Sequence, residues 1–379
     1  MDAFPSDFEP DENLEVAIQL PSGFPVDDIE QICALLVEAD PFVPAFEPNG
    51  FGLYSLAGQV WSLQFEEIET VMLPDRNIAS RMAQIARGEA IGKNAQIVAA
   101  ITAFAHFFDI MMEPSIAFHE LAPREGNESA LEELSWFRAA DHGDKYDWLE
   151  IAAGRRDRLS QPGEPRAPES HDLAKTLRDW STNYGAVLKL AEIELNHPGT
   201  PFEKIMVLLD WLHRDYFFAG QVATMACIFF GPINAPKAGL MKGLRSTDRE
   251  RAIAGAKNAA WDALYLSALN AMVNKAAGGP KRYIYASLDR RARQIARMAM
   301  SFGGDGPHRD VMFGILSEWW PDQEAAAIAD KFTCIALDID LPHMDEKRRK
   351  AAEGKKETIA RGEHTVRSWR GKSLHRDFQ

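Results

Sequence analysis

Cysteine is scarce in this sequence, and its placement excludes two classes of site. The 379 residues include three cysteines, Cys33, Cys227 and Cys334, which stand far apart in apolar surroundings. This spacing excludes a CxxC metal knuckle and provides no disulfide framework, so we expect three buried free thiols in a reducing compartment. The ten histidines form no H-x-E or HExxH cluster, which argues against a zinc hydrolase.

Long hydrophobic runs and N-terminal targeting features are also missing. The longest apolar stretch, residues 97–112, is interrupted by Thr102, His106 and Asp109 and is too short to span a bilayer. The sequence starts with Met1-Asp2-Ala3-Phe4-Pro5 and has no basic region of the kind that begins a signal peptide. These absences predict a cytoplasmic protein without a membrane partner.

The charge is distributed unevenly along the chain. The net charge of −14 argues against a non-specific nucleic-acid binder if the chain is taken as a whole. Residues 237–379, however, hold 26 Lys and Arg against 18 Asp and Glu, whereas residues 1–236 hold 16 against 38. The basic excess lies in the half that contains Asp262 and Asp289, which is compatible with a polyanionic substrate on that side.

Composition and local patterns divide the sequence into five segments. With 46% hydrophobic and 26% charged residues, the composition is that of a globular protein with one large domain and appendages. We expect a disordered acidic start at 1–12, a small α+β module at 13–69, a main domain at 70–300 with a helical insertion within about 125–245, a C-terminal extension at 301–344 and a charged tail at 345–379.

Hydrophobic periodicity predicts the elements within these segments. We expect helices over residues 27–38, 78–87, 94–108, 131–140, 172–196, 201–230, from the Ser246 cap through Asp262, and over 290–300. We expect strands over residues 14–20, 70–73 and 109–112, a hairpin over 51–65, and a strand that ends at Asp289. Asp338 and Asp340 form a further acidic pair, which could be extra metal ligands or part of a structural edge strand, and we favour the edge strand.

Four carboxylates stand in apolar sequence near the ends of predicted strands or on predicted helices. Asp75 follows residues 70–73, and Glu120 lies within an apolar segment. Asp262 has apolar neighbours on both sides, and Asp289 ends the run from Tyr283 to Leu288. Charged carboxylates in apolar surroundings are costly unless a positive charge compensates them, and several that converge usually bind a divalent metal ion.

The order of these motifs resembles that of the PIN-like nuclease family. Four stretches carry the resemblance: Leu73-Pro74-Asp75-Arg76-Asn77-Ile78-Ala79-Ser80, Pro114-Ser115-Ile116-Ala117-Phe118-His119-Glu120, Trp261-Asp262-Ala263-Leu264-Tyr265-Leu266 and Tyr285-Ala286-Ser287-Leu288-Asp289. The resemblance implies an α/β fold with a PIN-like central domain, whose mostly parallel sheet is flanked by helices. The interval of 142 residues between Glu120 and Asp262 implies the helical insertion.

The resemblance also implies a metal-dependent endonuclease that hydrolyses phosphodiester bonds. It favours RNA over DNA as the substrate and is compatible with a role as a toxin or in phage defence. In this reading Mg²⁺ or Mn²⁺ is held by Asp75, Glu120, Asp262 and Asp289, directly or through water. Asn77 and Ser287 would orient a carboxylate or a water molecule around the metal.

Each candidate residue also has a simpler interpretation. Asp75 and Asp289 could each be the N-cap of the helix that follows. Glu120 could be an exposed helical residue, and Glu113 competes with it for the role of ligand.

Other functional classes stay open as well. The protein could be a catalytically silent binding or assembly protein that keeps the fold, which the long insertion and Pro74 and Arg76 beside Asp75 favour. It could also be a metal-dependent phosphohydrolase that acts on a small phosphate ester. Whether it forms a homo-oligomer or has an inhibitory protein partner is open.

Overall fold

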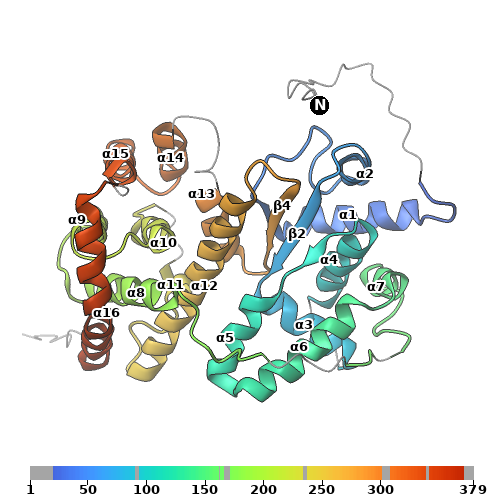
Figure 1. The fold of residues 1–379 in the computed structure, drawn as a ribbon, viewed down its shortest axis with the longest axis horizontal. Helices are drawn as coiled ribbons and strands as arrows, with labels where there is room; N and C mark the ends of the chain where they lie inside the picture. Colours follow the sequence, from blue (N-terminus) through green and yellow to red (C-terminus); the bar gives the residue numbers. More distant parts are fainter. Residues whose placement is uncertain are drawn as a thin grey trace, which may run out of the picture. The chain divides into compact units, whose positions relative to one another are not determined.

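The chain divides into two structural units, each assembled from segments that are distant in sequence (Figure 1). The computed structural model describes residues 20–89, 94–161, 163–165, 171–233, 237–300, 308–338 and 341–370. Unit 1 comprises residues 1–114, 131–171 and 276–288, and unit 2 comprises residues 115–130, 172–275 and 289–379.

A four-stranded sheet forms the centre of unit 1. Its strand order is β1 (Phe42–Pro44), β4 (Lys281–Ala286), β2 (Glu69–Pro74) and β3 (Met111–Met112). β2 runs parallel to both of its neighbours, whereas β1 pairs antiparallel with β4. β2 is buried along most of its length, as expected for a central strand with an apolar sequence. The predicted α/β fold with a mostly parallel sheet is therefore confirmed.

The register of β2 and β4 brings the carboxyl ends of these two strands together. Pro74 pairs with Ala286, so Asp75 and Ser287 follow at the same edge of the sheet. The backbone N–H of Asp75 donates to the carbonyl of Ala286 at 2.8 Å. β3, the next strand in sequence, pairs with one edge of β2, and β4 pairs with its other edge. The strand order therefore reverses at β2. In open α/β sheets, ligands bind at this kind of edge.

Unit 1 contains six helices among its described residues, and three of them pack against the apolar helix α4. The six helices are α1 (Val26–Ala39), α2 (Leu56–Gln64), α3 (Arg76–Ala86), α4 (Ala95–Phe107), the part of α6 (Asn127–Asp141) from residue 131, and α7 (Lys145–Ala152). α4 contacts α1, α3 and α7, which covers a sequence that is apolar on nearly every side. The ring of Phe104 lies 5.6 Å from that of Phe42 in β1, so α4 also packs against the sheet.

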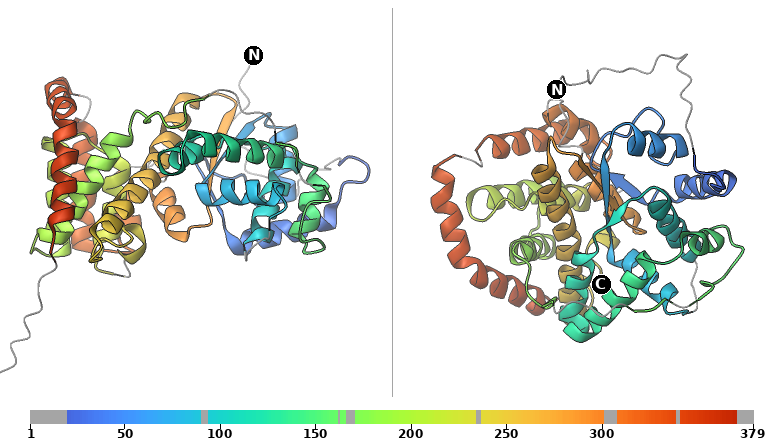
Figure 2. Two further views of the ribbon diagram at one scale, coloured as in Figure 1. Left: turned by 90° about the horizontal axis from the view of Figure 1, so that it is seen from below. Right: turned by 45° about the vertical axis from the view of Figure 1, so that its right-hand side comes forward.

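Helices are the only regular secondary structure among the described residues of unit 2. They are α5 (Ser115–Glu125), α8 (Trp180–Asn196), α9 (Pro201–Arg214), α10 (Gly220–Phe230), α11 (Lys237–Leu240), α12 (Arg249–Ala276), α13 (Arg290–Met300), α14 (His308–Leu316), α15 (Asp322–Asp338) and α16 (His343–Ser368). α10 is uniformly buried and contacts α8, α9, α11 and α13. α16 runs alongside α8 (Figure 2), where the Tyr184 hydroxyl donates to Glu363 at 2.7 Å.

The predicted hairpin over residues 51–65 is wrong, because this segment contains α2. The hydroxyl of Ser55 accepts a hydrogen bond from the backbone N–H of Gly58 at 3.3 Å. This cap satisfies one of the free N–H groups at a helix start and so favours a helix over a turn between strands.

The predicted edge strand around Asp338 and Asp340 is also wrong. The segment through Asp338 is the end of α15, and Asp340 lies outside the described residues. The buried residues of α15 recur three, four and seven positions apart, which is helical rather than strand spacing: Ala325, Ile328, Ala329 and Ile335.

Several predicted limits change. α8 starts at Trp180 rather than at residue 172, and β4 ends at Ala286 rather than at Asp289. Residues 201–230 form two helices instead of one, because the chain turns after Arg214 and α10 begins at Gly220.

The expectation of three buried thiols fails at one position. Cys33 and Cys227 are buried, whereas Cys334 is exposed on α15. The predicted acidic start at 1–12 and residues 14–19 of the predicted first strand lie outside the described residues. None of the helices described combines the length and apolarity needed to cross a lipid bilayer.

Candidate functional site

Asp75, Asn77 and Ser287 form one hydrogen-bonded cluster at the carboxyl edge of the sheet in unit 1. Oδ1 of Asp75 accepts from the backbone N–H of Arg76 at 2.7 Å, so Asp75 is the N-cap of α3. Its Oδ2 accepts from Nδ2 of Asn77 and from the hydroxyl of Ser287, each at 2.6 Å. Oδ1 of Asn77 in turn accepts from the backbone N–H of Leu288 at 3.1 Å. The cluster therefore ties the start of α3 to the segment that follows β4.

The cluster is almost closed to solvent. The exposed fraction is 7% for Asp75 and 0% for Ser287. The neighbouring guanidinium of Arg76 turns away to α6, where it donates to both carboxylate oxygens of Glu133 at 2.7 and 3.1 Å. The three hydrogen bonds described here for the Asp75 carboxylate come from neutral donors, one backbone N–H and two side chains.

The other three predicted acids lie in unit 2. Glu120 is on α5 with 8% of its surface exposed, so its interpretation as an exposed helical residue is wrong. Asp262 is half-buried on α12 and accepts from Nδ2 of Asn258 at 3.3 Å. Asp289 precedes α13, and its Oδ1 accepts from the backbone N–H of Arg291 at 2.8 Å. Glu113, the alternative to Glu120, belongs to unit 1.

The described residues do not assemble these acids into a metal centre. Within the ranges that the structure describes, no three His, Cys, Asp or Glu side chains are grouped so as to hold a metal ion. Asp75 already accepts three hydrogen bonds, and Asp289 accepts one from the first turn of α13. A Mg²⁺ or Mn²⁺ ion held by Asp75, Glu120, Asp262 and Asp289 therefore remains a prediction.

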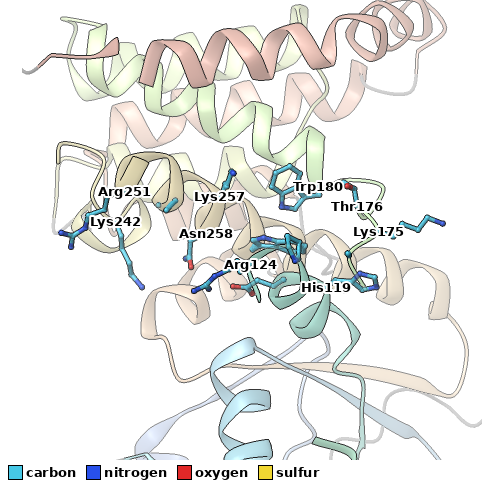
Figure 3. Close-up of a pocket in the computed structure, with 15 residues that line it drawn as sticks. His119, Arg124, Lys175, Thr176, Trp180, Lys242, Arg251, Lys257 and Asn258 are labelled. Carbon is cyan, nitrogen blue, oxygen red and sulfur yellow. The ribbon is translucent and has the colours of Figure 1, made fainter. Parts of the chain in front are cut away.

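A cavity of about 580 Å³ lies wholly within unit 2, and sequence reasoning did not find it (Figure 3). Its walls come from α5, the segment before α8, the start of α8, the segment before α12, and α12 itself. The lining residues are His119, Glu120, Pro123, Arg124, Ala174, Lys175, Thr176, Trp180, Lys242, Arg251, Ala254, Gly255, Lys257, Asn258 and Trp261.

Five cationic residues line this cavity, which we call the cationic pocket. They are Arg124, Lys175, Lys242, Arg251 and Lys257, against the single carboxylate of Glu120. All five cations are exposed, and none of them forms an ion pair with any residue in the described part of the chain. Because like charges in one concave surface reinforce each other's field, the pocket attracts anions.

A glycine on α12 allows one of these cations to reach the pocket. The backbone of Lys242 rests directly on Gly255, where an added Cβ would lie 1.9 Å from the Lys242 carbonyl oxygen. A side chain at position 255 would therefore push the segment that carries Lys242 off α12.

Two tryptophans supply the apolar part of the pocket. The rings of Trp180 and Trp261 lie 6.0 Å apart at an angle of 49°. Nε1 of Trp180 is buried and has no acceptor among the described residues. The pocket thus combines cationic residues with aromatic surface.

The pocket was hard to see in the sequence because its cations lie in separate segments that share no motif. One signal was present on α12. Arg251, Ala254, Gly255, Asn258 and Trp261 follow one another at steps of three, one, three and three residues. This spacing places them on one helix face, where a basic and an amide side chain flank two small residues.

No family model, curated protein or solved structure matches this chain. The α/β class, the sheet and the cationic pocket are accordingly established by the structure alone. The resemblance to PIN-like nucleases, with the metal chemistry that it implies, remains a prediction from the four sequence motifs.

Proposed function

We propose that the protein binds nucleic acid in the cationic pocket and hydrolyses it as a Mg²⁺- or Mn²⁺-dependent endonuclease, with RNA ahead of DNA as the substrate. The observation that carries this proposal is the set of five cations that line one cavity without an ion pair to any described residue, in a chain whose net charge is −14. In so acidic a chain, a cavity lined by five cations is best explained by an anion that they bind.

A phosphate backbone is the anion that fits the pocket best. Lysine and arginine heads from four separate segments can neutralise successive phosphates, while Trp180 and Trp261 offer a surface on which a base can stack. A base can reach an aromatic surface inside a cavity only when its strand is unpaired. The pocket therefore favours single-stranded over duplex nucleic acid.

Of the four predicted catalytic acids, one lines this pocket and a second is hydrogen-bonded to a lining residue. Glu120 lines it, and Asp262 accepts a hydrogen bond from Asn258, which also lines it. Buried carboxylates next to a phosphate-binding surface are the groups that hydrolysis of a phosphodiester with a divalent metal requires. This proximity supports the nuclease hypothesis beyond binding alone.

The test is cleavage of labelled single-stranded RNA and DNA with Mn²⁺ by the wild type and by Glu120→Gln and Asp262→Asn. Both substitutions remove a charge but keep side-chain size, and we expect each to reduce cleavage by at least about a hundredfold. The control is Glu353→Gln, which removes an exposed charge on α16 and should cleave like the wild type. Equal cleavage by all four proteins would contradict the assignment of the site.

A second candidate function is nucleic-acid binding without catalysis. The three hydrogen bonds that the Asp75 carboxylate accepts favour it, because a metal would have to compete with donors that are already in place. Binding without cleavage, together with no thermal stabilisation by Mn²⁺, would support this candidate. Activity on a chromogenic phosphate ester but not on polynucleotides would instead indicate a small-molecule phosphohydrolase.

A further inference from the structure

A second cavity in unit 2, of about 750 Å³, adjoins the cationic pocket. It is lined by Glu194 on α8, Phe229 on α10, Arg251 on α12, and Met241 and residues 243–246 of the segment before α12. Arg251 lines the cationic pocket as well, and so does Lys242, which directly precedes residues 243–246. The two cavities therefore meet at Arg251 and share the segment before α12 as a wall. We call the second one the Arg245 cavity.

The shared segment is fixed to α12 at several points. Nη1 of Arg249 donates to the carbonyls of Leu244 and Ser246 at 3.0 and 2.6 Å. Gly243 has a φ of +73°, and an added Cβ there would lie 3.0 Å from Cγ of Arg251. The stem of Arg251 thus lies against the segment at a position that favours glycine. Because these contacts are in place without a ligand, little ordering is needed when one binds.

Arg245 gives the Arg245 cavity an exposed positive charge. Its Nη2 donates to Oε1 of Glu194 at 2.6 Å, and Nζ of Lys204 donates to Oε2 of Glu194 at 2.9 Å. The exposed fraction of the side chain is 64% for Arg245 but 10% for Glu194, so the exposed member of this pair is the cation. A guanidinium carries five N–H donors, of which this bond uses one, so the others can bind phosphate oxygens.

The Arg245 cavity offers contacts to a phosphate rather than to a base. Among the described residues that line it, Phe229 alone is aromatic, and 3% of its surface is exposed. The surface on which bases can stack, Trp180 and Trp261, belongs to the cationic pocket, and Figure 3 shows Trp180 away from the end that holds Lys242 and Arg251. Arg251 and Trp261 are ten positions apart on α12, which separates their backbones by about 15 Å. Stacking surface and phosphate contacts are therefore spaced along this helix.

We propose that the Arg245 cavity is a phosphate site for the same unpaired strand that the cationic pocket binds. The strand's bases stack on Trp180 and Trp261, its backbone runs past Arg251, and a later phosphate accepts hydrogen bonds from the guanidinium of Arg245. This inference rests on the proposed nucleic-acid function. It makes the ligand a chain of about four nucleotides or more instead of a free nucleotide, because a single nucleotide does not extend from the tryptophans to Arg245.

The dependence of affinity on strand length tests the proposal. The probes are fluorescein-labelled oligouridylates of three and six nucleotides, and their binding to the full chain is measured by fluorescence anisotropy in EDTA, which prevents metal-dependent cleavage. The trimer is long enough for the cationic pocket alone, whereas the hexamer also reaches the Arg245 cavity. We expect the hexamer to bind about tenfold more tightly than the trimer at low salt.

Arg245→Gln separates the two cavities. It should weaken binding of the hexamer about fivefold and reduce the salt slope by about 0.7, the contribution of one phosphate on a single strand. Binding of the trimer should be unchanged, which also shows that the variant is folded. Arg309→Gln is the matched control, because it removes another exposed guanidinium that is paired with a carboxylate, Asp330, outside both cavities. It should bind both probes like the wild type.

The outcomes distinguish this inference from the proposed function. Equal affinity of the wild type for trimer and hexamer, unchanged hexamer binding in Arg245→Gln, or an equal loss for both lengths would overturn the phosphate site in the Arg245 cavity while the cationic pocket still binds RNA. Absence of binding of either length to the wild type would overturn the proposed nucleic-acid function and this inference with it.

Discussion

The hydroxyl of Ser287 donates a 2.6 Å hydrogen bond to Oδ2 of Asp75, across 212 positions of the sequence. The parallel register of β2 and β4 brings these two residues together, because Pro74 pairs with Ala286 and both strands end there. The bond therefore joins the start of α3 to the segment that follows β4.

Ser287→Ala should lower the free energy of unfolding by about 1–2 kcal/mol, because a buried carboxylate loses one of its donors. Asp75→Ala should lower the free energy of unfolding by about 2–4 kcal/mol, since it removes the N-cap of α3 and the acceptor that Asn77 and Ser287 share. Urea denaturation of both single variants and the double variant measures the coupling between them. The exposed Ser368→Ala is the control, and strictly additive losses would contradict a direct interaction.

Gly255→Ala should destabilise unit 2 and weaken nucleic-acid binding. The added Cβ would lie 1.9 Å from the carbonyl oxygen of Lys242, and a backbone atom can move away only if its segment shifts. We expect a loss of about 2 kcal/mol or more.

Gly314→Ala is the matched control for this change. Gly314 lies on α14, and an added Cβ there would meet no atom within 4 Å. We expect this variant to gain up to about 1 kcal/mol from its higher helix propensity. Equal behaviour of the two variants in thermal and urea unfolding would contradict the close approach of Lys242.

The three cysteines should differ sharply in reactivity toward a thiol reagent such as DTNB. Cys334 is exposed and should react at once under native conditions. Cys33 and Cys227 are buried, and desolvation raises the pKa of Cys33 to about 11, so little of its reactive thiolate forms near neutral pH. We expect one thiol that reacts rapidly with DTNB in the wild type and none in Cys334→Ser. A fast thiol that persists in Cys334→Ser would show that one of the other two is accessible.

Asp338 should make unit 2 sensitive to acid. Nε2 of His213 lies 2.8 Å from its Oδ2, and this hydrogen bond lowers the pKa of Asp338 below its ordinary value of 3.8. Nε2 of His343 lies 3.4 Å from the other carboxylate oxygen and acts in the same direction.

A carboxyl group whose pKa is lowered in the folded chain stabilises it above the unfolded pKa, and the contribution disappears as pH falls through the lowered value. The Tm of the wild type should therefore fall more steeply with decreasing pH than the Tm of Asp338→Asn below about pH 4. Parallel curves for the two proteins would show that the carboxylate does not titrate differently on folding.

Much of the fold was predictable because local sequence patterns and the final environment agree. The apolar run before Asp75 became a buried parallel strand, and the uniformly apolar segment from 95 to 107 became the most enclosed helix of unit 1. The short apolar run around Asp338 fits the period of a strand as well as that of a helix, so its sequence alone predicts a strand. Only the preceding turns of α15, with Ala325 and Ile328 on one buried face, indicate the helix.

The candidate site was predictable only in part. Asp75, Asn77 and Ser287 could be proposed because strand ends place polar residues at a sheet edge, and the structure brings these three into contact. The cationic pocket depends on helices that pack across long sequence intervals, for which lysines such as Lys175 and Lys242 leave no local pattern. The approach of Lys242 to Gly255 is a backbone contact that a sequence does not display.

The affinity for a short labelled single-stranded RNA, measured over a series of salt concentrations, tests the central claim most directly. The informative protein is Lys242→Ala/Lys257→Ala, and the control is Lys350→Ala/Lys356→Ala, which removes the same charge from exposed positions on α16. If the cationic pocket holds the phosphates, the pocket variant binds more weakly and its salt slope falls by about 1.4, while the control matches the wild type. Equal affinity and equal slope in all three proteins would contradict nucleic-acid binding at this site.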